Sequence, residues 1–184
     1  MCIRDSTSGI LKNRKIKSFE VDIRPTKESV REAIFSSIGG TCNNLHILDL
    51  YAGYGSFGLE AWSRGARRVT FVENQKFLTN QLSQFIKDIK DERLGITQVI
   101  CADVSAWLLK NTQTYDLIFA DPPYFLEGAF ISTLSAIDKS SSLNENGCVI
   151  FELSYRDNIV LPDIWKIIKE KRYGKTKILM LKRN

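Results

Sequence analysis

The feature that most constrains the fold of this chain is a regular alternation of strand and helix patterns across its middle. Short apolar runs predict strands, and the longer amphipathic segments between them predict helices. The predicted strands are residues 46–51, 68–73, 97–101, 115–120 and 147–153. The predicted helices are residues 56–64, 76–91, 105–110 and 127–137. This alternation predicts right-handed crossovers and a mostly parallel sheet covered on both faces.

The two ends of the chain carry additional elements. Two β-rich runs follow the alternating part, near residues 165–172 and 177–182, and residues 10–23 alternate loosely, as in a short hairpin or arm. Pro25 and Thr26 then begin a helix, with Thr26 suited to the N-cap. The first eight residues fit no periodic pattern, and we expect them to be disordered or not native. We therefore expect an arm over residues 1–24 and one larger domain over residues 25–184.

Composition excludes several classes of protein. The four cysteines form no CxxC pair and His46 is the sole histidine, so we expect no metal site. No apolar run approaches the roughly 20 residues of a membrane-spanning helix, and the start of the chain lacks the apolar core of a secretory signal. We expect a cytoplasmic protein that does not bind membranes, and nothing in the sequence points to an obligate dimer, so we expect a monomer.

The charge distribution favours a polyanionic partner. The net charge is +5, and the basic residues gather in two clusters, at residues 12–31 and 166–184. A solvated basic surface explains either cluster alone. Two such clusters, one on each side in sequence of the segment that carries the candidate catalytic motifs, favour a surface that contacts phosphates.

A glycine-rich segment, Asp-Leu-Tyr-Ala-Gly-Tyr-Gly-Ser-Phe-Gly at residues 49–58, follows the first predicted strand. Glycines let the backbone turn tightly and approach a ligand closely. Such a loop is weak evidence alone, since it also suits a dinucleotide or a plain βα turn. The carboxylate of Asp49 suits a cation, such as the ammonium of a methionine moiety, and would repel a pyrophosphate. We assign Asp49, Tyr51, Gly53 and Gly55 to a cofactor site.

Acidic residues also follow the next two predicted strands. Glu73 can accept hydrogen bonds from both hydroxyls of a ribose, which suits NAD and S-adenosylmethionine equally. Asp103 can accept from the amino group of an adenine, or it can cap the following helix, and both roles can coexist. We assign these two residues and their neighbours, Asn74 and Val104, to the cofactor site.

The most specific motif is Asp121-Pro122-Pro123-Tyr124, after the fourth predicted strand. An exocyclic amine of a nucleic-acid base is a poor nucleophile, because its lone pair is delocalised into the ring. The Asp121 carboxylate and the Pro122 carbonyl can hold its two hydrogens and direct the nitrogen toward a methyl donor. Asp121 can also accept a proton, and Tyr124 offers a face for stacking. We assign all four residues to catalysis.

With these motifs the chain resembles the RsmD family, the bacterial 16S rRNA guanine-N2 methyltransferases. The resemblance rests on the glycine-rich segment, Asp-Pro-Pro-Tyr, an upstream Arg-Pro-Thr and a Tyr-Gly-Lys-Thr near the end, and it runs from about Gly9 to Lys182. It implies a Rossmann-like class I methyltransferase fold, with a seven-stranded, mostly parallel sheet whose last strand is antiparallel, and a small N-terminal hairpin.

The resemblance also implies a reaction and a partner. The donor is S-adenosylmethionine, which becomes S-adenosylhomocysteine, and the acceptor is the guanine at position 966 in the usual rRNA numbering, in the small ribosomal subunit. The cofactor role includes Asp121 as well as the acids and glycines already assigned. Arg14, Arg24, Thr26 and Tyr124 inherit a role near the RNA, although the residues alone would make Arg24-Pro25-Thr26 a simple helix start.

One departure and three alternatives remain. The arm, which we expect to recognise RNA, has Ser8-Gly9-Ile-Leu-Lys-Asn13-Arg14 where the family has Gly-Gly-x-x-x-Gly-Arg. A DNA adenine-N6 or cytosine-N4 methyltransferase would use the same motif but needs a target-recognition segment. An NAD-dependent oxidoreductase leaves residues 121–124 without a use. A non-catalytic RNA-binding protein would have no reason to keep that motif intact.

Overall fold

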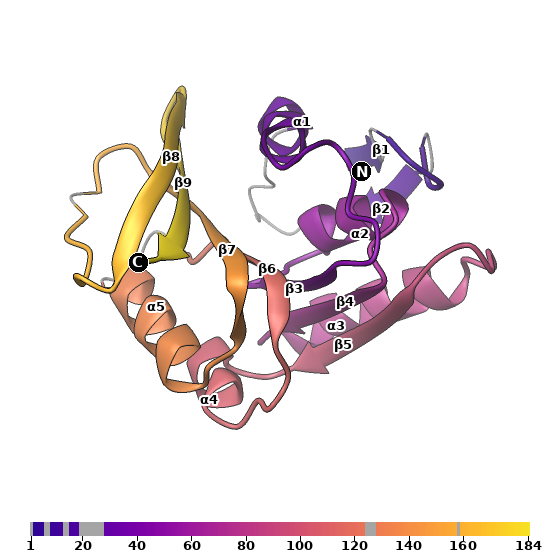
Figure 1. Ribbon diagram of the computed structural model, residues 1–184. Helices are drawn as coiled ribbons and strands as arrows, with labels where there is room; N and C mark the ends of the chain where they lie inside the picture. The colour runs from indigo at the N-terminus through magenta and orange to yellow at the C-terminus, as the bar shows by residue number, and fades with distance from the viewer. Residues whose placement is uncertain (1, 6–7, 13–14, 19–27, 124–127, 158) are drawn as a thin grey trace.

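The computed structural model describes residues 2–5, 8–12, 15–18, 28–123, 128–157 and 159–184. These residues form a large seven-stranded sheet, five helices and a separate two-stranded sheet (Figure 1). The large sheet contains β3 (His46–Leu50), β4 (Arg68–Glu73), β5 (Ile96–Cys101), β6 (Tyr115–Ala120), β7 (Leu143–Ser154), β8 (Trp165–Tyr173) and β9 (Thr176–Arg183). The helices are α1 (Glu28–Ser37), α2 (Ser56–Ser63), α3 (Lys76–Lys87), α4 (Val104–Leu108) and α5 (Ala129–Lys139).

The strand order of the large sheet is β5-β4-β3-β6-β7-β9-β8. The chain moves outward from β3 to β5 and then returns to pair β6 with β3, so the direction of winding reverses between these two central strands. All neighbouring pairs from β5 to β7 are parallel, whereas β9 runs antiparallel to both β7 and β8. The mostly parallel sheet predicted from the strand and helix patterns is confirmed, and so are the seven strands and the antiparallel last strand that the resemblance implied.

Helices cover both faces of this sheet, as Figure 1 shows. One apolar cluster joins α1, α2 and α3 to one face, and a second joins α4 and α5 to the other. Parallel strands covered in this way are apolar on both sides. β3 and β6 follow this rule, since four of the five residues of β3 and five of the six residues of β6 are buried.

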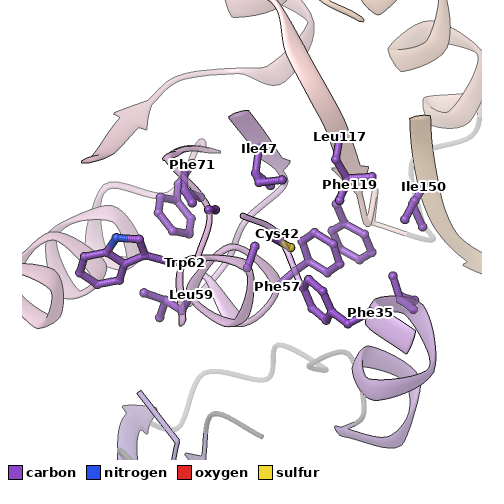
Figure 2. Packing of buried hydrophobic residues seen from close by; sticks show 14 of the residues in the cluster. Phe35, Cys42, Ile47, Phe57, Leu59, Trp62, Phe71, Leu117, Phe119 and Ile150 are labelled. Carbon is purple, nitrogen blue, oxygen red and sulfur yellow. The ribbon is translucent and has the colours of Figure 1, made fainter. Parts of the chain in front are cut away.

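Three phenylalanines fix α1 and α2 against the centre of the sheet. The ring of Phe57 on α2 stacks on Phe119 of β6 at a centroid distance of 4.0 Å, and on Phe35 of α1 at 4.8 Å (Figure 2). All three side chains are buried. This column sets the position of α2, the helix that the glycine-rich segment leads into.

Several predicted boundaries differ from the observed ones. The two-stranded sheet pairs β1 (Cys2–Asp5) with β2 (Lys15–Ser18), so its first strand lies in the segment for which no structure was expected. β7 begins at Leu143 rather than at residue 147, and α3 ends at Lys87 rather than at residue 91. The predicted start of the first helix, at Pro25 and Thr26, lies outside the described residues. None of the helices in the described ranges has the length and apolarity needed to cross a membrane.

Candidate active site

The loops that follow the central strands open at one edge of the sheet. Leu50 of β3 pairs with Ala120 of β6 on one side and with Val72 of β4 on the other. The part of the glycine-rich segment that follows β3, from Tyr51 on, therefore begins directly beside Asp121. In open parallel sheets ligands bind at this edge, where the winding direction reverses. The structure thus brings together the two motifs that the sequence predicted to act together.

The glycine-rich segment forms a tight turn between β3 and α2. Tyr51, Gly53 and Gly55 have φ angles of 57°, 56° and 76°, in the left-handed region that favours glycine. Gly55 is the N-cap of α2, and a Cβ added there would lie 2.7 Å from Cδ1 of Leu82. The predicted turn is confirmed, and its backbone conformation requires glycine at residue 55.

Glu73 holds this turn to the end of β4. Its Oε2 accepts a hydrogen bond from the backbone N–H of Gly53 at 2.9 Å, and its Oε1 accepts from the N–H of Gln75 at 2.9 Å. The side chain is 7% exposed. The sequence indicated a ligand-binding carboxylate at this position but not its contact with the glycine turn, which depends on the pairing of β3 with β4.

Asp49 is the most buried acid of the site, with 1% of its surface exposed. Its Oδ2 accepts a hydrogen bond from the N–H of Gly58 in α2, at 2.9 Å. Burial raises the pKa of Asp49 to about 8, the nearby Glu73 carboxylate adds to the rise, and the Gly58 hydrogen bond opposes it. This oxygen positions the helix, and the expected contact of Asp49 with a cationic ligand stays a prediction.

Asp103 follows β5 and caps α4. Its Oδ1 accepts a hydrogen bond from the N–H of Ala106 at 2.9 Å, and the side chain is exposed. The capping role that the sequence allowed is therefore confirmed. Val104, the first residue of α4, is buried, and Asn74 is exposed beside the end of β4. The roles of these three residues toward a cofactor stay predictions.

Tyr51 links the glycine turn to α5. Its hydroxyl lies 2.8 Å from Oγ1 of the buried Thr133, and burial raises the pKa of Tyr51, with a smaller contribution from Asp103. Thr133 is 82 residues further along the chain, and no local sequence pattern signals such a contact. The bond fixes Tyr51 against the helix that follows the Asp121 segment.

The proline-rich corner leaves β6 directly. Asp121 and Pro123 are half-buried, and Pro122 is buried. Tyr124, Arg14, Arg24 and Thr26 lie outside the described residues, so their predicted roles stay predictions. In the part of the chain that the structure describes, no three His, Cys, Asp or Glu side chains gather as metal ligands would.

The residues present suit a nucleoside with a cationic tail. Three carboxylates, those of Asp49, Glu73 and Asp103, lie at or beside the ends of adjacent strands. A carboxylate can accept about four hydrogen bonds in all, so Glu73 retains capacity for ribose hydroxyls besides its two backbone partners. S-adenosylmethionine carries such hydroxyls, an adenine amino group and two positive charges, and it fits this set of acceptors.

Known proteins resemble this chain over most of its length. The Ribosomal RNA small subunit methyltransferase D of Buchnera aphidicola (subsp. Acyrthosiphon pisum) is 33% identical over 168 residues, which cover 89% of this chain and 85% of that protein. The solved structure of HI0767 from Haemophilus influenzae is 26% identical, with a TM-score of 0.82 and 99% of each chain covered.

A second solved structure, yhhF from Escherichia coli, covers 100% of this chain with 99% of its own length, and its TM-score is 0.87. At 22% identity this likeness shows a shared fold alone, the Rossmann-like class I fold that the family resemblance implied. The sequence pattern described as Conserved hypothetical protein 95 matches residues 6–182. The chain therefore belongs to the Conserved hypothetical protein 95 family, which is the RsmD methyltransferase family that its motifs resemble.

Proposed function

We propose that this protein transfers a methyl group from S-adenosylmethionine to the exocyclic N2 of a guanine in 16S rRNA of the small ribosomal subunit. The observation that carries the proposal is the pairing of Leu50 with Ala120, which sets the glycine turn beside Asp121. The name of the Buchnera relative, Ribosomal RNA small subunit methyltransferase D, supports this class of substrate. The guanine at position 966 is the target that the family resemblance implies.

The protein's own residues align the guanine amine with the methyl donor and accept the proton that the amine loses. S-adenosylmethionine, when bound, supplies an activated methyl group on a sulfonium. The Asp121 carboxylate and the Pro122 carbonyl hold the two hydrogens of the guanine amine, so that its lone pair points toward the glycine turn. The two prolines stiffen this corner and donate no hydrogen bonds. Asp121 accepts the proton that the nitrogen loses, and alignment supplies the larger share of the rate.

The fold argues against the oxidoreductase alternative. In the dinucleotide-binding arrangement the strand order is 3-2-1-4-5-6, so the last strand of the chain lies at the edge of the sheet. Here β9 runs back between β7 and β8, antiparallel to both. A DNA amino-methyltransferase would use the same corner, and the choice of substrate in the assay decides between RNA and DNA.

Methyl transfer from labelled S-adenosylmethionine tests the reaction directly. The acceptors are naked 16S rRNA, small ribosomal subunits and DNA, and the products are digested to nucleosides. We expect label in N2-methylguanosine from RNA or from subunits. Label in N6-methyladenosine, or label in DNA alone, would contradict the proposed substrate.

Substitution of Asp121 tests the assignment of the site. Asp121→Ala should lower kcat by about 100-fold or more, because the amine loses both an acceptor and a base. Affinity for S-adenosylhomocysteine should stay close to that of the unaltered protein. Asp163→Ala is the matched control, since Asp163 is exposed and lies just before β8, at the opposite edge of the sheet. Persistent activity in Asp121→Ala would show that the proposed base is wrong.

A further inference from the structure

A second group of polar side chains lies at the same edge as Asp121, around Tyr155. β7 pairs with β6 through Phe151 and Ala120, and it continues to Ser154, which pairs with Thr176 at the start of β9. β7 therefore extends three residues, or roughly 10 Å, beyond the level at which β6 ends. The turn between β8 and β9 lies at this level. We define the Tyr155 cluster as Tyr155, Arg156, Arg172, Lys175 and Lys177.

Two guanidinium groups of the cluster lie over one aromatic ring. The Cζ of Arg172 is 4.1 Å from the centroid of the Tyr155 ring, and that of Arg156 is 5.4 Å from it. The Nε of Arg172 donates to the carbonyl of Gly174 at 3.0 Å. The Nε of Arg156 donates to the hydroxyl of Tyr155 at 2.9 Å. Both arginines are thus held by the ring and by a single Nε hydrogen bond.

This mode of attachment keeps the charge of both arginines available. A carboxylate partner would neutralise a guanidinium, whereas an aromatic ring orders it and leaves its charge in place. Both side chains are exposed, and within the described ranges their terminal Nη nitrogens form no hydrogen bond or ion pair. A guanidinium presented in this way offers two parallel donors that match two oxygens of a phosphate.

Two lysines add to the positive charge. The carbonyl of Lys175 accepts from the N–H of Tyr155 at 3.1 Å, and the Nζ of Lys177 donates to the carbonyl of Asp157 at 2.7 Å. The carboxylate of Asp157 accepts instead from the N–H of Ser154. Glu170 forms no ion pair with the cluster among the described residues, and Glu152, three residues before Tyr155, is buried in β7. Four cations therefore gather near three acids, Asp157, Glu170 and the buried Glu152.

We propose that the Tyr155 cluster binds the phosphodiester backbone of the RNA next to the nucleotide held at Asp121. This inference rests on the proposed function and names a second contact region for the same substrate. The phosphates of RNA repel one another, and the cations of the cluster also repel one another. Contact between the two sets relieves both repulsions, because each phosphate then lies beside a cation. Phosphate contacts of this kind set the position of the nucleic acid and carry no sequence information.

A double substitution, Arg156→Gln with Arg172→Gln, tests the cluster. The probe is transcribed 16S rRNA, with its Kd measured between about 50 and 200 mM salt. We expect Kd at low salt to rise about tenfold. The slope of log K against log salt should fall in magnitude by about 1.4, or 0.7 for each phosphate contact on a single strand. In methyl-transfer assays KM for RNA should rise with kcat nearly unchanged.

The control removes the same charge from the opposite edge. Lys110→Gln with Lys139→Gln changes two exposed lysines that precede β6 and β7, and it should leave the salt slope unchanged. Lys175→Gln is a single substitution at an exposed turn and should reduce the magnitude of the salt slope by about 0.7. All variants should keep the unfolding midpoint and the affinity for S-adenosylhomocysteine of the unaltered protein.

Two outcomes separate this inference from the proposed reaction. An unchanged Kd and salt slope in the Arg156/Arg172 variant, with active unaltered protein, would overturn the cluster and leave the reaction standing. A weakened RNA affinity in that variant, with no methyl transfer to RNA by the unaltered protein, would support the cluster and overturn the reaction.

Discussion

Asp49 and Glu73 are buried carboxylates whose observed partners are backbone N–H groups. Asp49 binds the start of α2 through Gly58, and Glu73 binds the glycine turn through Gly53. Each acid therefore shapes the loop that a ligand would contact, in addition to any direct contact. The two acids also interact, because the negative charge of Glu73 contributes to the raised pKa of Asp49.

The ionisation of Asp49 should make stability depend on pH. Its pKa is about 8 in the folded protein, above its ordinary value of 3.8, so the folded state binds this proton more tightly than the unfolded state. The free energy of unfolding should therefore fall as pH rises from about 4 to about 8. Asp49→Asn keeps an oxygen for the Gly58 N–H and lacks the titration, so its stability should fall less over this range.

Urea unfolding at several pH values measures this difference. Asp163→Asn, at an exposed position, is the control and should follow the unaltered protein at every pH. Parallel pH profiles for Asp49→Asn and the unaltered protein would show that burial does not raise the pKa of Asp49.

Residue types at strand ends were predictable, and their partners were not. An acid before a helix suits an N-cap, and Asp103 is one. The bonds from Glu73 to Gly53 and from Tyr51 to Thr133 join residues 20 and 82 positions apart. Such contacts depend on which strands pair and in which register, and a local pattern does not contain that information.

Among the elements, α2 carries the strongest packing constraint near the site. Phe57 stacks on both Phe35 and Phe119, so one side chain connects two helices to a central strand. Gly58 follows it, and a Cβ there would lie 2.2 Å from Cε1 of Phe71 in β4. α2 therefore lies close against the sheet, which keeps the glycine turn at its edge.

Phe57→Ala should cost about 3–5 kcal/mol of unfolding free energy, because it removes a buried ring and leaves a cavity. Phe57→Leu refills part of that space and should cost less. Urea unfolding monitored by circular dichroism gives both values. A cost under about 1 kcal/mol for alanine would mean that Phe35 and Phe119 close the gap.

The start of α4 offers a way to separate capping from ligand binding. Asp103→Ala removes the N-cap and should cost about 1 kcal/mol, whereas Asp103→Ser keeps a capping oxygen and should cost little. A serine is too short to reach an adenine amino group. If Asp103 binds the cofactor, calorimetry should show both variants with equally weakened S-adenosylhomocysteine affinity. Normal affinity in Asp103→Ser would limit Asp103 to the cap.

Two segments that the sequence did not predict as strands, the start of β7 and the strand β1, have weak local patterns. Residues 143–147 read Leu-Asn-Glu-Asn-Gly, a composition that is depleted in strands, yet they begin β7. Leu143 pairs with Tyr115 across a register shift, so the sheet extends β7 where the sequence resembles a loop. β1 has only four residues, and its pairing with β2 supplies the order that its own pattern does not signal.

At the scale of the whole molecule, S-adenosylhomocysteine should stabilise the fold and NAD should not. S-adenosylhomocysteine at 100 times its Kd should add about 2.7 kcal/mol to the free energy of unfolding. For a chain of this length that corresponds to a rise in Tm of roughly 5–10 °C. NAD at the same concentration should leave Tm unchanged. A larger shift with NAD would contradict the assignment of the cofactor and favour a dinucleotide.

The reversal of winding between β3 and β6 divides the chain at the midline of the sheet. Most residues assigned to the donor belong to the half that ends with α4, whereas the Asp121 corner and the Tyr155 cluster belong to the half that begins with β6. These halves meet along the β3–β6 ladder, at the Phe57–Phe119 stack and through the bond between Tyr51 and Thr133. Substitutions in the loops of the second half can therefore alter recognition of the acceptor while the glycine turn and its acids are inherited intact.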